Sequence, residues 1–175
     1  MKQFNLIVLA AALIGNFAQA DNHNLTSDAI GNLLGLSNIE YSYKIASHVT
    51  FGFRGTNGKA SLGDYGLSGN SYGAVTRWYQ QPALENDSWY FGATVDKENF
   101  EVKTTSNSTE YKANFKDVVA GIGGGYQWFW KSFNIGMGAY GTNRENIDLK
   151  DSQGNNYKDS VGSRLAVEIT MGGKF

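Results

Sequence analysis

The chain has 175 residues, with 15 basic and 16 acidic side chains and a formal net charge of −1. A chain this close to neutral shows no sign of the basic surface that nucleic-acid binding requires. It contains no cysteine, which excludes disulfides and thiolate metal sites. Its length suits one domain of ordinary size.

The first twenty residues have the form of a secretory signal peptide. Lys2 gives a basic start, a mostly apolar stretch runs from Phe4 to Gly15, and Ala18-Gln19-Ala20 is a small-x-small cleavage pattern. The alternative is a membrane-anchoring helix. A membrane-spanning helix needs about 20 apolar residues, and this stretch is shorter. We therefore expect cleavage after Ala20, with residues 1–20 as signal peptide and residues 21–175 as one mature domain.

Beyond residue 20, the main pattern is an alternation of apolar and polar side chains with the two-residue period of a β-strand. The first predicted strand has no clear phase. It is included because a barrel chain that starts and ends on one side of the membrane needs an even number of strands. Eight strands are predicted in chain order, at residues 27–36, 37–45, 47–55, 72–80, 88–96, 117–130, 132–142 and 164–175.

The links between these strands differ in length. Short links occur at Ala46-Ser47 and Lys131-Ser132, and a modest one covers residues 80–87. Longer polar links cover residues 56–70, 103–114 and 143–162. Short turns at one rim and long loops at the other are typical of a transmembrane β-barrel. The predicted fold class is therefore all-β, an eight-stranded antiparallel transmembrane barrel.

Large aromatic side chains lie beside the short turns. Trp128 and Trp130 lead into the Lys131-Ser132 turn, while Trp78 and Trp89 lie on strand ends at the same predicted rim. A surface turn usually carries small polar residues. Aromatic girdles occur where a barrel meets the membrane interface. We expect these four tryptophans to face lipid headgroups.

The last strand ends in an aromatic residue that continues its apolar face. Val167, Ile169, Met171 and Phe175 alternate with charged and small residues. Together with the signal peptide, this pattern resembles the small OmpA/OmpX-like eight-stranded barrels of the Gram-negative outer membrane. The resemblance implies an outer-membrane location and insertion by the barrel assembly machinery, which reads the last strand. It also implies a monomer in contact with lipid and lipopolysaccharide.

The predicted inward faces carry four acidic and four basic residues. An eight-stranded barrel is only wide enough for its own side chains to fill, and buried charges are costly unless they are paired. We expect these charges to pair as a plug, with an ion pathway as the alternative. The arginines should each lie near a carboxylate. The set is Glu40, Lys44, Arg54, Arg77, Asp96, Asp117, Arg164 and Glu168.

Three functions remain open at this stage. The first is a structural or surface-interaction role, and the second is a narrow, porin-like channel for small solutes. The third is an enzyme acting on outer-leaflet lipid, which needs a base near its nucleophile. His23 is expected in an N-terminal tail and His48 at a periplasmic turn, so we predict no catalytic residues, no cofactor and no metal site.

Overall fold

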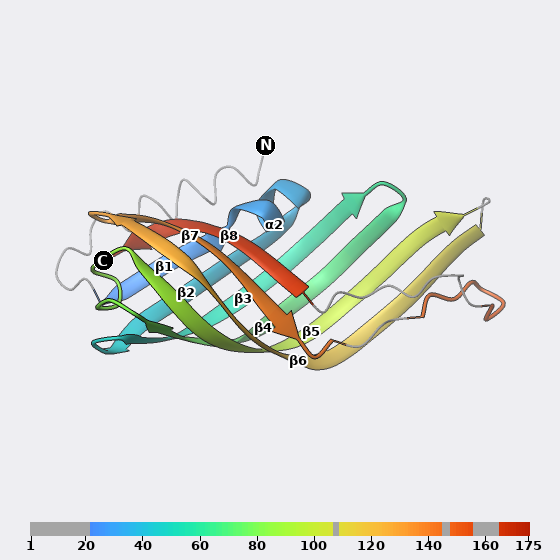
Figure 1. Cartoon of the computed structure of the whole chain (residues 1–175). Coiled ribbons are helices and arrows are strands. Elements are labelled where there is room, and N and C mark those ends of the chain that lie inside the picture. Colours follow the sequence, from blue (N-terminus) through green and yellow to red (C-terminus); the bar gives the residue numbers. More distant parts are fainter. Residues whose placement is uncertain (1–21, 107–108, 145–147, 156–164) are drawn as a thin grey trace.

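The computed structural model of the chain describes residues 22–106, 109–144, 148–155 and 165–175. Residues 1–20 and Arg164 lie outside the described residues. One antiparallel sheet closes on itself, with each strand next to its neighbour in sequence and the last next to the first (Figure 1). The predicted fold class, an eight-stranded antiparallel barrel, is confirmed. The strands are β1 His23–Asp28, β2 Leu36–Ala46, β3 Val49–Leu62, β4 Tyr65–Tyr79, β5 Ser88–Ser106, β6 Thr109–Trp130, β7 Phe133–Thr142 and β8 Leu165–Lys174.

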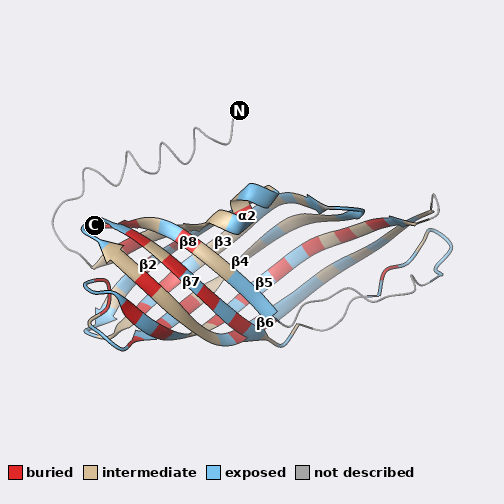
Figure 2. Cartoon of the chain, turned by 45° about the horizontal axis from the view of Figure 1, so that its top comes forward, coloured by how far each residue is buried: buried red, intermediate tan, exposed pale blue. Residues whose placement is uncertain are grey.

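The barrel has apolar side chains outside and polar ones inside. Phe53, Phe91 and Ile122 have 62%, 67% and 75% of their surface exposed, whereas Glu40 and Arg77 are buried. Buried and exposed residues alternate along β5 and β7 (Figure 2). This distribution is the reverse of that in a water-soluble protein, which buries its apolar side chains. It is the pattern that a barrel with an apolar solvent around it requires.

The prediction of a first strand at residues 27–36 was wrong. The first strand is β1, and α2, a helix at Ala29–Leu34, lies inside the predicted range. Asp28 caps this helix by accepting a hydrogen bond from the backbone N–H of Ile30, and Gly35 ends it with a left-handed φ of 98°. Among the described residues, no helix is long and apolar enough to cross a bilayer.

Two of the three predicted long loops are strands as well. Residues 56–70 form the upper parts of β3 and β4, which are joined by a turn at Gly63 and Asp64. The described part of residues 103–114 belongs to β5 and β6. Their exposed outward positions, such as Asn57, Lys59, Lys112 and Asn114, are polar, so the outward apolar row that marks a membrane strand is absent. The barrel is therefore lopsided, with β5 and β6 reaching far beyond β7 and β8 (Figure 1).

The extended β5–β6 hairpin has a partly covered inner face. The backbone of Lys112 exchanges hydrogen bonds of 2.8 and 3.0 Å with Lys150, which follows β7 in the chain. The neighbouring Leu149 is fully buried, and Phe100 and Val102 on β5 are buried too. The hairpin thus keeps apolar side chains buried beyond the ends of β7 and β8.

Candidate functional site: the barrel interior

Arg77 of β4 lies at the centre of the barrel interior. Its guanidinium makes two hydrogen bonds to the carboxylate of Glu40 on β2, the one from Nη2 being 3.0 Å long. Nη2 also donates to Glu168 on β8, at 3.2 Å. These strands are not neighbours in the sheet, so the bonds cross the lumen. A buried charge bonded in this way is neutralised by its partners rather than by water.

Two tyrosines complete this group. Arg77 Nε donates to the Tyr140 hydroxyl at 3.2 Å, and its guanidinium carbon lies 5.2 Å from the centre of the Tyr90 ring. The Tyr90 hydroxyl donates in turn to Glu168 at 3.1 Å. Inward glycines make room for the Tyr90 side chain, because a Cβ added to Gly125 would lie 2.6 Å from the Tyr90 hydroxyl. The arginine is thus held by carboxylates, a hydroxyl and an aromatic face at once.

Two further ion pairs lie along the inner face of β5. Arg54 on β3 donates to Asp96 through Nε at 2.8 Å and through Nη2. Arg144, just after β7, donates to Glu98 through Nε at 3.1 Å and through Nη2, and lies over the ring of Phe115. The Arg144–Glu98 pair was not predicted, because the strand predicted at residues 88–96 ended before Glu98.

Two of the predicted lumen charges are not part of these contacts. Lys44 forms an ion pair with Glu85, in the link between β4 and β5. Asp117 is exposed, and its carboxylate accepts a hydrogen bond from the backbone N–H of Val118. Asp117 lies on β6 beyond Gly121, the last residue of β6 that pairs with β7. Strand β7 therefore does not enclose the Asp117 side chain.

Uncharged side chains form a layer nearer the short turns. The Tyr79 hydroxyl donates to Gln127 at 2.9 Å, Gln127 donates to Asn134 at 2.8 Å, and Asn134 donates to Asn24 at 2.7 Å. All four side chains are buried, and they come from β4, β6, β7 and β1. Among the described residues, no buried side-chain nitrogen or oxygen lacks a hydrogen-bond partner. We call the four side chains of Tyr79, Gln127, Asn134 and Asn24 the amide layer.

A cavity of about 10 Å³ lies between the amide layer and Arg77. It is lined by residues of both groups, and its volume is near the lower limit for one water molecule. The residues that line it are Asn24, Thr26, Glu40, Arg77, Tyr90, Gln127, Gly136 and Thr170.

The link between β4 and β5 folds inward instead of lying in water. We call residues 80–87 the strap. Within it, Ala83 and Leu84 have none of their surface exposed and pack with Tyr79, Tyr90 and Tyr140. Leu84 has a φ of 64°, a left-handed conformation that is uncommon for a residue with a side chain. The strap therefore places an apolar residue pair at the turn end of the barrel interior.

Polar contacts hold the strap from several sides. The buried Lys174 Nζ donates to the Leu84 carbonyl at 2.9 Å, and the Ala83 N–H donates to the Ser47 carbonyl at 2.7 Å. Glu85 pairs with Lys44, and its pKa is held below the usual value by the hydrogen bond and charge of that lysine. The strap thus binds to β2, to β8 and to the β2–β3 turn.

The four tryptophans lie at the rim that carries the short turns. Trp130 stacks on Phe133 across the Lys131-Ser132 turn, and Trp78 stacks on His48 in the β2–β3 turn. Trp89 and Trp128 lie near the same rim, and both contact Tyr126. All four are outward-facing positions in the register of the sheet.

The C-terminal residues lie at the seam that closes the barrel. Val167 and Met171 are exposed on the outer face of β8, with Ile169 between them. Phe175 exchanges two backbone hydrogen bonds of 3.0 Å with His23 and stacks on its ring. The expectation that His23 lies in a free tail was therefore wrong, because it begins β1. Among the described residues, no cluster of His, Cys, Asp or Glu could hold a metal ion.

The comparison with solved structures identifies the same architecture. The chain is similar to the N-terminal β-barrel domain of Pseudomonas aeruginosa OprF, with a TM-score of 0.59 and 10% sequence identity. The match covers 89% of this chain and 98% of that domain. No protein-family model and no curated protein matches the sequence. The likeness shows an OmpA-like eight-stranded barrel fold, as the resemblance in the sequence implied.

Proposed function

We propose that the protein is a monomeric outer-membrane barrel with a closed lumen and a structural or surface-interaction role. The observation that carries this proposal is the set of bonds from Arg77 to Glu40 and Glu168, which crosses the barrel between strands that are not neighbours. The amide layer and the strap lie between these bonds and the turn end. An ion crossing the lumen has to displace all three, which disfavours the alternative of a porin-like channel.

The outer face supports the membrane location. Its outward positions carry many exposed apolar residues, and the tryptophans lie at the rim of the short turns, as interfacial aromatics do. In this orientation the short turns face the periplasm and the β5–β6 hairpin faces outward. Residues 1–20 serve as the export signal, and β8 with Phe175 is read by the barrel assembly machinery. Lipid and lipopolysaccharide surround the outer face.

Orientation is tested by labelling introduced cysteines, since the chain has none of its own. The variant Thr105→Cys places a cysteine near the tip of the β5–β6 hairpin. The matched variant Ser132→Cys places one in the short turn before β7. A membrane-impermeant maleimide should label the first in intact cells and the second only after the outer membrane is opened. Equal labelling of both in intact cells contradicts the proposed orientation.

Lumen closure is tested by conductance in planar bilayers. The purified, folded protein should give no stepwise current at moderate voltage. Regular single-channel steps from the unmodified protein contradict the closed lumen and support the channel.

A further inference from the structure

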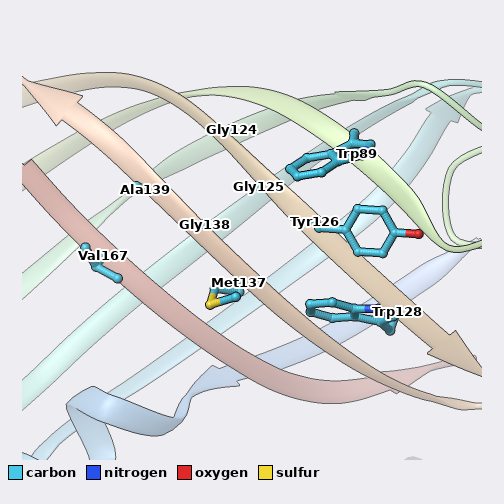
Figure 3. A pocket seen from close by; sticks show the side chains of 9 residues that line it. All are labelled: Trp89, Gly124, Gly125, Tyr126, Trp128, Met137, Gly138, Ala139 and Val167. Atoms are coloured by element: carbon cyan, nitrogen blue, oxygen red, sulfur yellow. The ribbon is translucent and has the colours of Figure 1, made fainter.

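The outer wall of the barrel contains an apolar groove across β5, β6, β7 and β8. It is an open hollow of about 590 Å³. Figure 3 shows aromatic side chains at one end, glycines and Met137 in the middle and Val167 at the other end. The lining residues are Trp89, Gly124, Gly125, Tyr126, Trp128, Met137, Gly138, Ala139 and Val167.

The hollow arises from missing side chains at outward positions. Gly124 pairs with Ala139, so two small residues lie side by side, whereas the next outward row toward the turn rim carries Tyr126 and Met137. A Cβ added to Gly124 would lie 2.6 Å from the Tyr90 carbonyl oxygen, so a larger residue requires the backbone to move. The close approach of β5 and β6 therefore maintains the groove.

The two ends of the groove differ in polarity. At the turn rim, Tyr126 packs between Trp89 and Trp128, with ring centres 5.1 and 4.8 Å away. These side chains carry one hydroxyl and two indole N–H groups, and in Figure 3 the Tyr126 hydroxyl points away from Val167. The middle and the far end, at Met137, Ala139 and Val167, have apolar side chains only. This gradient matches a molecule with a polar head and a hydrocarbon tail.

We propose that this groove binds one acyl chain of a phospholipid from the leaflet next to the short turns. The glycerol region lies at the three aromatic residues, and the chain follows the hollow toward Val167. A flexible acyl chain can follow an open hollow whose lining is almost entirely apolar. It also restores the dispersion contacts that an unfilled groove lacks. For a second copy of this chain to fill the groove instead, it would need a narrow apolar ridge that is polar at one end in the same way. The inference rests on the proposed membrane location.

The test uses a photoreactive lipid. The protein is reconstituted in vesicles of phosphatidylethanolamine and phosphatidylglycerol that contain a trace of phosphatidylethanolamine with a diazirine midway along one acyl chain. After irradiation, crosslinked peptides are mapped by mass spectrometry. Crosslinks at Met137, Ala139 and Val167 should exceed those at the exposed Phe53 by roughly tenfold, the ratio that a preference of 1.4 kcal/mol gives.

A matched pair of variants locates the effect. Ala139→Trp fills the groove and should lower crosslinking at Met137 and Val167 to the level of Phe53. Ala74→Trp, the same change at an outward position on β4, should leave it unchanged. The distribution on the unmodified chain remains decisive even if Ala139→Trp does not fold.

Each other outcome has a defined meaning. Equal crosslinking at the groove and at Phe53 overturns the acyl-chain site but leaves the membrane location intact. An absence of lipid crosslinks on the whole outer face contradicts the membrane location itself. Lipid crosslinks at Phe53 but none at the groove residues overturn the inference in favour of a second copy that covers the groove.

Discussion

Arg77 and Glu40 form a two-bond ion pair across the barrel interior, from strands that are separated in the sheet by β3. Both side chains are buried, with 6% and 4% of their surface exposed. Arg77 also bonds to Glu168, so this one arginine neutralises two carboxylates. The stability of the interior therefore depends unequally on the three residues.

Replacing Arg77 with Met should cost more stability than any single carboxylate replacement. Arg77→Met leaves both Glu40 and Glu168 without their cation, and removing one partner of a buried pair typically costs about 3–5 kcal/mol. Glu168→Gln leaves the Arg77–Glu40 bonds in place and should cost less. Urea unfolding of the purified proteins in lipid vesicles gives both values. Equal losses for the two variants would show that the Arg77–Glu40 bonds contribute nothing.

The strap, the amide layer and the Arg77 bonds should act as three closures in series. Arg77→Ala opens the middle of the lumen, Gln127→Ala opens the amide layer, and Leu84→Gly removes the buried side chain of the strap. We expect little conductance from any of these variants alone, and clear single-channel steps in planar bilayers from the triple variant. A fully conducting Arg77→Ala variant would show that the strap does not block ions.

Acid should loosen the strap at Glu85. Because Lys44 lowers the pKa of this carboxyl group, the pair stabilises the strap above the ordinary pKa of about 4.3. That stabilisation is lost as the pH falls through the lower folded-state value. Glu85 is half-exposed, so the effect should stay below about 1 kcal/mol.

Hydrogen exchange at the Ala83 N–H, which is bonded to Ser47, measures this loosening. The protection factor of the unmodified protein should fall below pH 4. In the Glu85→Gln variant, the protection factor of the Ala83 N–H should already be lower at neutral pH and should change little as the pH falls. The same pH dependence in both proteins would assign the effect to another group.

Deleting Phe175 should impair barrel closure more than a change of similar size in a loop. The deletion removes two backbone hydrogen bonds to His23 and the stacked ring at the β1–β8 seam. Closed barrels resist SDS until they are boiled, so the folded fraction can be read from gel mobility. Deletion of Gln153 is a suitable control. Equal folded fractions for the two deletions would argue against a role for the seam.

Alternation in the sequence was enough for the barrel wall but not for what fills it. A two-residue period assigns a face to each residue, and the ion pairs of Arg54 and Arg77 lie on the assigned inner face. The period says nothing about height along the barrel. The partners of these arginines therefore came only from the register, which depends on the pairing of every strand.

Three features escaped sequence analysis for physical reasons. The strap looked like an ordinary link, because nothing in its composition shows that Ala83 and Leu84 turn inward. Glu98 was missed because its surroundings are polar on both faces. The helix α2 could have been found, since Asp28 and Gly35 stand seven residues apart as an N-cap and a C-cap signal.

The unequal strand lengths determine how far the protein reaches from the membrane in the proposed orientation. The last apolar outward residue of β5 is Val95, and the strand continues to Ser106. At about 3.3 Å per residue and a tilt of about 40°, this part rises about 28 Å above the hydrocarbon boundary. Strands β7 and β8 end near that boundary, so the protein is tall on one side only. An antibody or phage that approaches through the lipopolysaccharide layer would meet the β5–β6 tip before any other part of the barrel wall.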